Sequence, residues 1–445
     1  MFNRLALTKL SDWFNSKERK PLIIRGARQT GKTTAVRMLA KNIPGYMEVN
    51  FEAPGEKSLF TRNLSVDDLV SAVRLKKNSQ APLTESLLFL DEIQACPEAI
   101  GYLRFLAEEM PELAVIASGS LLETYIEKEG IEFPVGRVEQ TFIYPVTFSE
   151  YLGAMQRVEM QSLLKSIPFP DYALKPVYDE YVRYALAGGM PEVVRLLSEG
   201  YKLDSLQHFY SSLIQSFTDD VPKYSTGASM RRVIAHCLES TPLYTGSRIK
   251  FAGFGSSNYR SREVGEAMRT LRRAMLLQLV YPTSEVTPPA KPNLKKHPKL
   301  FFLDSGLLTH SVGLQSDLLG TSDLNDAFRG ILAEQQIAQT LLAINNKTIF
   351  WARESRGSSA EVDFLYQNNG MLIPIEVKSG PTGRLRSLHS YIDRCPHGYA
   401  VRFYSGPVAI NNLKTLNGKP FKLLNLPHFL CEYLPRYLDW FTREN

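Results

Sequence analysis

The feature that most constrains this chain is the segment Gly26–Thr33, which fits the pattern G-x-x-x-x-G-K-[ST] at every fixed position. It follows an apolar run at residues 21–24 and precedes a stretch in which Val36, Leu39 and Ala40 share one helical face. In this motif a loop joins a strand to a helix, and its backbone N–H groups face phosphate oxygens at the positive end of the helix dipole. The pattern therefore predicts a phosphate-binding loop on a parallel α/β sheet.

The residue types in this loop suit a nucleoside triphosphate bound with Mg²⁺. Glycines permit the turn, the lysine reaches the β- and γ-phosphates, and the threonine hydroxyl is a Mg²⁺ ligand. Arg28, inside the loop, is a further candidate for a phosphate contact. The predicted ATP-binding residues are Gly26, Ala27, Arg28, Gln29, Thr30, Gly31, Lys32, Thr33 and Thr34.

Two carboxylates follow the next buried run. Residues 87–90 are continuously apolar, which is typical of a buried parallel strand, and Asp91 and Glu92 come directly after them. We predict that Asp91 binds Mg²⁺ together with Thr33, and that Glu92 polarises the attacking water.

Two further candidates follow later strands. Residues 113–117 form an apolar run that ends at Ser118, and either this serine or Ser120 would serve to sense the γ-phosphate; the sequence does not choose between them. Arg137 precedes a predicted strand at residues 139–144. It could stabilise charge in the transition state, at its own site or at that of a neighbouring subunit, or it could be an ordinary surface arginine.

The middle of the chain is helical and then basic. Residues 148–223 have a helical pattern, interrupted by two glycines and a proline in the segment 187–192, and we predict a small helical lid that packs on the nucleotide. Between residues 226 and 282 there are nine Lys or Arg and three Asp or Glu, so this segment accounts for the whole net charge of +6. A local basic excess is typical of a protein with a polyanionic partner, although a solvated helix face is the alternative.

Within this basic segment we predict a winged helix-turn-helix, with a wing strand at residues 276–282. A helix should begin near Ser261 as its N-cap, with a core face formed by Val264, Met268, Leu271 and Met275. The other face carries the predicted DNA-binding residues Arg262, Arg269 and Arg273. The same fold could also serve only to pack domains together. Lys295, Lys296 and Lys299 are expected in a basic linker.

Acidic residues gather in the C-terminal third. Asp363 and Glu376 are separated by twelve residues, as expected for two strands of a hairpin, and Lys378 should share a face with Glu376. A helical pattern upstream contains Glu334. This set suits phosphodiester hydrolysis, with three carboxylates around Mg²⁺ and a lysine that orients water. A degenerate site that binds DNA without cutting it would have much the same pattern.

Taken in order, the motifs GARQTGKTT, LLFLDEIQ, ASGS, AGGMPE, FFLDSGLL, EVDFL and IPIEVKSG resemble a group of prokaryotic AAA-type ATPases fused to a C-terminal restriction-endonuclease-like domain of unknown function. The resemblance covers nearly the whole chain. It implies an α/β multidomain protein with a P-loop NTPase core, a helical lid, a winged helix and a PD-(D/E)xK-like domain. In this sequence the motif reads Glu361-Val362-Asp363 and has no Pro before the Asp. This departure from the Pro-Asp pattern bears on catalysis.

We expect four domains, at residues 1–147, 148–225, 226–298 and 299–445. No run approaches the ~20 apolar residues that span a bilayer, and the four cysteines are scattered without a CxxC pair. These features predict a reduced, cytoplasmic protein without a membrane partner. The leading hypothesis is an ATP- and Mg²⁺-dependent switch that acts on DNA. The alternatives are a nucleotide-gated module for a protein partner or self-association, and a Mg²⁺-dependent nuclease regulated by ATP.

Overall fold

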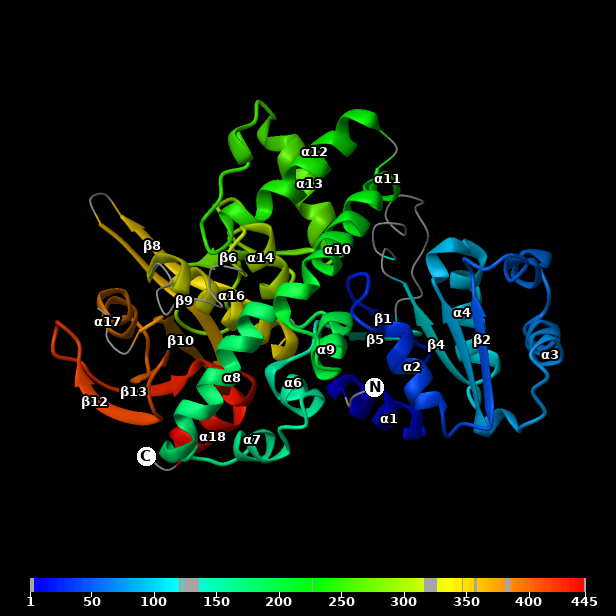
Figure 1. Ribbon diagram of the computed structural model, residues 1–445, viewed down its shortest axis with the longest axis horizontal. Coiled ribbons are helices and arrows are strands. Elements are labelled where there is room, and N and C mark those ends of the chain that lie inside the picture. Colours follow the sequence, from blue (N-terminus) through cyan, green and yellow to red (C-terminus); the bar gives the residue numbers. More distant parts are fainter. Residues whose placement is uncertain are drawn as a thin grey trace.

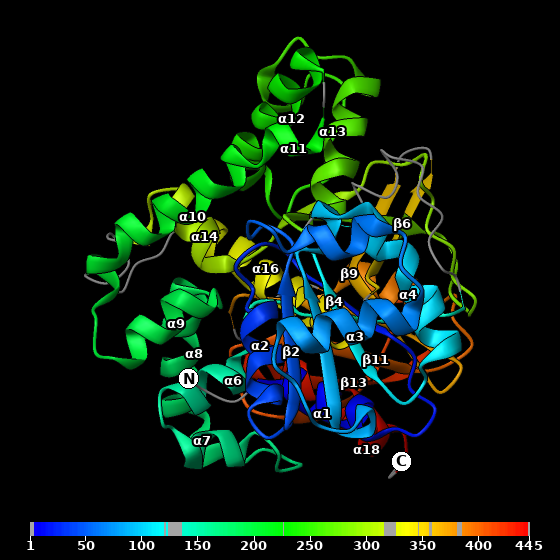
Figure 2. The same ribbon diagram turned by 90° about the vertical axis from the view of Figure 1, so that its right-hand side faces the viewer.

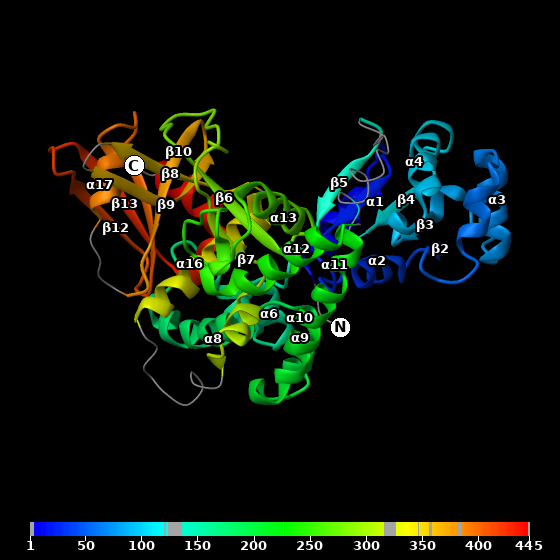
Figure 3. The ribbon, with the colours of Figure 1, turned by 90° about the horizontal axis from the view of Figure 1, so that it is seen from above.

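The computed structural model describes residues 4–119, 122, 136–225, 227–315, 326–345, 347–355, 358–380 and 385–443. Two sheets lie at opposite ends of an elongated molecule, with helices from the middle of the chain between and above them (Figure 1). The view from above shows the same separation of the N-terminal and C-terminal sheets (Figure 3). None of the helices in these ranges is long and apolar enough to cross a membrane.

The N-terminal sheet is parallel throughout, in the order β2-β3-β4-β1-β5, which confirms the predicted α/β core. Its strands are β1 (Leu22–Arg25), β2 (Gly45–Asn50), β3 (Ser86–Asp91), β4 (Ala114–Ser118) and β5 (Glu139–Phe142). Its helices are α1 (Leu5–Asn15), α2 (Lys32–Ala40), α3 (Val66–Lys76) and α4 (Pro97–Glu109). Because successive strand residues point to opposite faces, Leu88 lies in one core with α3 and α4, whereas Phe89 lies in another with α1 and α2.

The middle of the chain is mostly helical, and residues 207–273 rise above the N-terminal sheet, whereas residues 148–198 lie beside it (Figure 2). The helices are α6 (Phe148–Ala154), α7 (Val158–Leu163), α8 (Leu174–Ala187), α9 (Pro191–Ser198), α10 (Gln207–Asp219), α11 (Val221–Tyr224), α12 (Ala228–Ser240), α13 (Ser261–Arg273) and α14 (Ser305–Ser311). The predicted N-cap of α13 is wrong by one residue. Ser261 is the first helical residue, because Arg260 takes the N-cap position and its backbone N–H donates to the Glu263 carboxylate over 2.9 Å.

The C-terminal sheet is mixed and has the order β12-β13-β11-β10-β9-β8-β6-β7. Its strands are β6 (Leu277–Thr283), β7 (Lys299–Phe302), β8 (Ile349–Ser355), β9 (Ser358–Asn368), β10 (Met371–Val377), β11 (Tyr399–Tyr404), β12 (Ala409–Lys414) and β13 (Pro420–Pro427). The helices α16 (Asp326–Asn345) and α18 (Leu434–Arg443) pack on one face, and α17 (Arg386–Ile392) packs on the other.

The strand expected as a wing belongs to this larger sheet. β6 pairs antiparallel with β7 and parallel with β8. The domain border predicted after residue 298 therefore falls between two hydrogen-bonded strands.

Candidate nucleotide site and C-terminal carboxylate cluster

The glycine loop lies between β1 and α2, as its sequence predicts. Gly31 is in the left-handed region, with φ 91°, and forms the N-cap of α2. A Cβ on Gly26 would lie 2.4 Å from the backbone oxygen of Ile143, so this position has no room for a side chain. Gly31 is therefore required by its backbone conformation, and Gly26 is required because a side chain there would clash.

Lys32 is buried and bends back onto its own loop. Its ammonium donates to the carbonyl oxygens of Gly26 and Ala27, over 3.0 and 2.9 Å. Burial lowers the pKa of Lys32 to about 8, although Glu92 and Asp91 act in the opposite direction. The lysine is therefore held at the loop, and it loses its charge at mildly alkaline pH.

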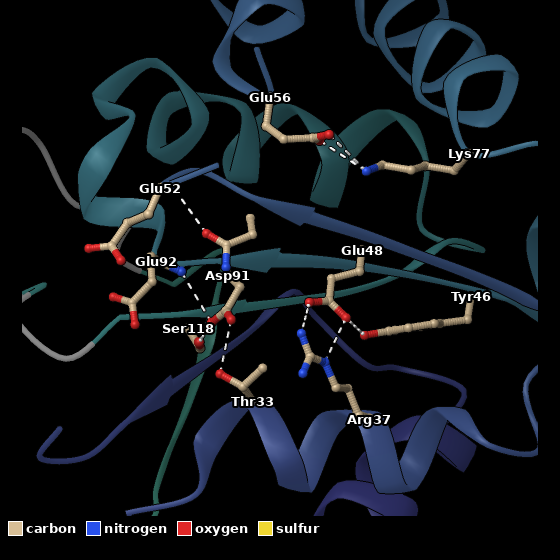
Figure 4. Close-up of polar contacts among 11 residues, drawn as sticks. Thr33, Arg37, Tyr46, Glu48, Glu52, Glu56, Lys77, Asp91, Glu92 and Ser118 are labelled. Atoms are coloured by element: carbon tan, nitrogen blue, oxygen red, sulfur yellow. Dashed lines mark hydrogen bonds and ion pairs between the residues drawn. The ribbon is translucent and has the colours of Figure 1, made fainter. Parts of the chain in front are cut away.

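Asp91 is the centre of a hydrogen-bonded trio at the carboxyl edge of the sheet (Figure 4). The Thr33 hydroxyl donates to Asp91 Oδ2 over 2.9 Å, and the Ser118 hydroxyl donates to Asp91 Oδ1. The trio forms because β4 lies between β1 and β3, so that the ends of all three strands adjoin. The structure thus brings these three predicted residues together; Ser120, the alternative to Ser118, lies outside the described residues.

The trio fits a magnesium ion that is bound mainly through a nucleotide. Mg²⁺ prefers oxygen ligands and is often held by one or two carboxylates together with substrate phosphates. Thr33 and Asp91 offer one hydroxyl and one carboxylate. In the described part of the chain, no group of three or more His, Cys, Asp or Glu residues could hold a metal by itself.

Glu92 lies beside this trio and is held by its own loop. It has φ 53°, and its Oε2 accepts a hydrogen bond from Gln94 Nε2 over 2.5 Å. Burial raises the pKa of Glu92 above its ordinary value. Gln94 Oε1 is buried and has no hydrogen-bond partner among the described residues, which leaves an acceptor available next to the carboxylate.

The helical segment contacts the loop through an ion pair that the sequence did not predict. Arg28 Nη1 lies 2.6 Å from Asp220 Oδ1, and Asp220 is buried between α10 and α11. Lys223 reaches the same oxygen over 2.9 Å. The hydrogen bond to Asp220 is the main cause that raises the pKa of Arg28. Arg28 thus binds the helical segment in this structure, whereas the sequence suggested a phosphate.

Two more segments border the loop. Pro191, at the start of α9, would lie 3.6 Å from a Cβ placed on Gly31. Arg4 donates to the backbone oxygens of Thr30 (3.3 Å) and Tyr144 (2.7 Å). Arg4 belongs to no motif, so sequence analysis had no signal by which to find it.

Arg137 does not reach the nucleotide site of its own chain. Glu139 pairs with Leu22 at the amino end of β1, whereas the phosphate-binding loop follows the carboxyl end. Arg137 precedes Glu139, and it forms an ion pair of 3.0 Å with Glu108 of α4. Parallel pairing thus places Arg137 toward the edge of the sheet opposite the loop, which does not favour the cis alternative; a role at a neighbouring subunit stays a prediction.

The predicted DNA-binding residues lie on one side of α13. Arg262 and Arg269 are exposed and Arg273 is half-buried, while Val264, Met268 and Leu271 are buried, as the periodicity predicts. The next arginine, Arg272, borders a cavity of about 820 Å³ between α13, the N-terminal sheet and the C-terminal sheet. Among the described residues, those that line this cavity include no Asp or Glu. Its polar and aromatic lining includes Arg25, Phe142, Tyr144, Arg272, Lys347 and Asn369.

The C-terminal candidates also lie together. Asp363 on β9 and Glu376 on β10 come from neighbouring antiparallel strands, as expected for a hairpin. Lys378 donates to Glu376 Oε1 over 2.6 Å, and the backbone N–H of Val377 donates to Asp363 Oδ2 over 2.9 Å. Burial, and after it the charge of Asp363, raises the pKa of Glu376 to about 8 and that of Glu334 to about 7.

A lysine that the sequence placed in a linker lies among these carboxylates. Lys299 is buried on β7, and its ammonium lies 2.9 Å from Glu361, 3.0 Å from Asp363 and 3.5 Å from Glu334. Burial favours the neutral amine, but the carboxylates, Asp363 foremost, raise the pKa of Lys299 well above its ordinary value. The linker assignment is wrong for Lys299, because this residue begins a strand paired with β6.

Comparison with known families agrees with the N-terminal geometry. Residues 18–152 match the family described as "AAA domain". This N-terminal part of the chain is similar to AAA domains and has a phosphate-binding loop of the P-loop type. Residues 178–318 and 329–418 match two domains of unknown function, DUF8612 and DUF4143. Among curated proteins, no relative of the chain was found.

Solved structures that resemble this one are distant. The Walker-type ATPase PABY2304 of Pyrococcus abyssi is 14% identical, with 70% of this chain and 96% of that chain covered and a TM-score of 0.44. The ORC2 protein of Aeropyrum pernix is 12% identical, with 71% and 93% covered and a TM-score of 0.30. The ORC1 protein of the same organism, solved in complex with DNA, is 14% identical, with the same coverage and a TM-score of 0.28. At these scores the likenesses carry no argument about function.

Proposed function

We propose that this protein hydrolyses ATP and uses the nucleotide state to control how it binds DNA. The observation that carries the proposal is the Asp91 trio, with Lys32 and Glu92 beside it at one edge of the sheet. When bound, ATP·Mg²⁺ would supply a polarised γ-phosphoryl group. Lys32 would bind its phosphates, Thr33 and Asp91 would hold the metal, and Ser118 would fix the orientation of Asp91. Glu92 would accept the proton of the attacking water.

Contacts around the loop support a switch. Arg28 pairs with Asp220, Gln29 donates to the Ser216 hydroxyl over 3.4 Å, and Pro191 borders Gly31, so the phosphate-binding loop touches the helical segment at several points. From Pro191 the contacts continue to the C-terminal sheet, because the backbone N–H of Gly189 donates to Asp304 Oδ2 over 2.6 Å. Asp304 lies two residues after the end of β7. A phosphate that draws Arg28 away from Asp220 would therefore act on a lid that is joined to the distant sheet.

The basic side of α13 supports DNA as the partner. One further arginine of α13, Arg272, lines a cavity whose described lining holds no acidic residue and includes aromatic rings and amides. Arginines bind phosphates, and aromatic rings stack with bases. A phosphate-binding surface should have a steep salt dependence, because each neutralised phosphate releases counterions.

The test is DNA binding by the full chain, measured by fluorescence anisotropy across a salt series. Replacing Arg262, Arg269 and Arg273 with Gln should weaken binding and lower the slope of log K against log salt by about 0.9 for each phosphate that these arginines neutralise. The control removes three exposed charges elsewhere, at Arg62, Arg104 and Lys175, and should leave the slope within error. Equal effects of the two triple variants would contradict a DNA surface on α13 and favour the protein-partner hypothesis.

A further inference from the structure

We propose that the ammonium group of Lys299 permanently occupies the divalent-cation position of the C-terminal carboxylate cluster, so that this cluster binds no metal in the native protein. The inference goes beyond the ATPase and DNA-binding proposals and depends on neither of them.

The geometry of the carboxylates suits an ammonium group better than a metal ion. Three oxygens, from Glu361, Asp363 and Glu334, lie 2.9–3.5 Å from Lys299 Nζ. These are hydrogen-bond and ion-pair distances, whereas Mg²⁺ requires oxygens at about 2.0–2.1 Å in octahedral geometry. The carboxylates are thus spaced around a nitrogen that is already present.

The oxygens of Asp363 are both in use. Oδ1 faces Lys299, and Oδ2 accepts the backbone N–H of Val377. Glu376, which should be the second metal ligand of the hairpin, gives Oε1 to Lys378 instead, while its Oε2 is buried without a hydrogen-bond partner among the described residues. Three of the four carboxylate oxygens on which the metal prediction depended are therefore directed to protein cations or a backbone N–H.

Lys299 is fixed in place by its strand. It pairs with Val280 on β6 and forms a second backbone bridge to Arg248. Its ammonium lies 5.5 Å from the centre of the Phe350 ring, and its side chain is only 5% exposed. Moving the Lys299 ammonium away from its three carboxylates would be costly, because it would leave buried charges without a partner of opposite sign.

The test counts bound Mn²⁺ by electron paramagnetic resonance on the nucleotide-free full chain. In the wild-type background, Asp363→Asn should leave the number of bound ions unchanged, since Lys299 excludes metal from this cluster. A bound ion that is present in the wild-type protein and lost in Asp363→Asn overturns the proposal. This comparison does not require any change at Lys299.

The complementary variants remove the ammonium. Lys299→Ala, or Lys299→Met to retain the volume, should gain one Mn²⁺ per chain, and the gain should disappear in the double variant with Asp363→Asn. Lys299→Arg keeps the charge and should gain none. Circular dichroism establishes that each variant is folded, and ATP turnover, which needs no residue of this cluster, should stay within about twofold of wild type. A folded Lys299→Met protein that binds no additional ion overturns the proposal.

Discussion

The Arg28 guanidinium lies 2.6 Å from the carboxylate of Asp220, which joins the phosphate-binding loop to the junction of α10 and α11 across 192 residues of sequence. The carboxylate is almost fully buried and the guanidinium is partly exposed. A hydrogen bond to a charged group contributes about 1.5–3 kcal/mol, and the exposure of Arg28 places this pair at the low end. In the proposed switch, a bound phosphate replaces this pair and releases the helical segment.

Asp220→Asn should release Arg28 and loosen the lid. We expect faster amide exchange in α11 of the nucleotide-free protein and ATP affinity raised several-fold, because Arg28 no longer has to leave a carboxylate. The neighbouring Asp219 is exposed and bonds only to Gln215 among the described residues, so Asp219→Asn is the matched control. Hydrogen exchange and calorimetry measure the two effects. Indistinguishable behaviour of the two variants would show that the ion pair does not restrain the lid.

ATP affinity should fall at alkaline pH because Lys32 must be charged to bind phosphate. Its pKa is lowered to about 8 in the nucleotide-free protein, so below pH 8 the affinity should be nearly constant. Above it, the affinity should fall by up to about tenfold per pH unit, since a proton must be taken up on binding. Between pH 8 and a pH of about 10.4, the unfolded chain still carries this proton while the folded chain has lost it. The contribution of Lys32 to the free energy of unfolding therefore rises with pH in this window.

Calorimetry at pH 7, 8 and 9, in buffers of different ionisation enthalpy, measures the affinity and the proton uptake together. A Lys32→Arg variant stays charged throughout this range, so any affinity it retains should vary little with pH. An affinity of the wild-type protein that is flat to pH 9 would contradict the lowered pKa.

Gly189 should tolerate no side chain. A Cβ there would lie 2.2 Å from the backbone oxygen of Val146, and the Gly189 oxygen already accepts the Val146 N–H over 2.6 Å. We expect Gly189→Ala to destabilise the fold by at least about 2 kcal/mol. Gly101 lies in α4 with open space around it, so Gly101→Ala should be neutral or stabilising by up to about 1 kcal/mol. Thermal unfolding of the two variants compares them, and an unchanged midpoint for Gly189→Ala would contradict the packing described.

The parts of the fold that were predictable are those in which local pattern determines geometry. The loop from Gly26 to Thr33 requires a strand before it and a helix after it, and the apolar run before Asp91 requires a buried parallel strand. These elements bring Thr33, Asp91 and Ser118 together because carboxyl ends of parallel strands meet at one edge.

Long-range pairing was not predictable from one sequence. Lys299 resembles the preceding lysines of a basic run, and only the pairing of β7 with β6 shows that it is buried. The position of Arg137 depends on the register between β1 and β5, which hydrophobic pattern does not determine. The partner of Arg28 lies at a distant junction between two helices that carry no motif.

The most direct test of the account is ATP binding and hydrolysis by the full chain and its Glu92→Gln variant. The substitution keeps the size of the side chain and removes the base, so we predict that ATP affinity stays within a few-fold while turnover falls by at least about 100-fold. Lys32→Ala should lose binding as well, which separates the two roles. A Glu92→Gln protein that hydrolyses ATP at the wild-type rate, or a wild-type protein without Lys32-dependent hydrolysis, would contradict the assignment of this site.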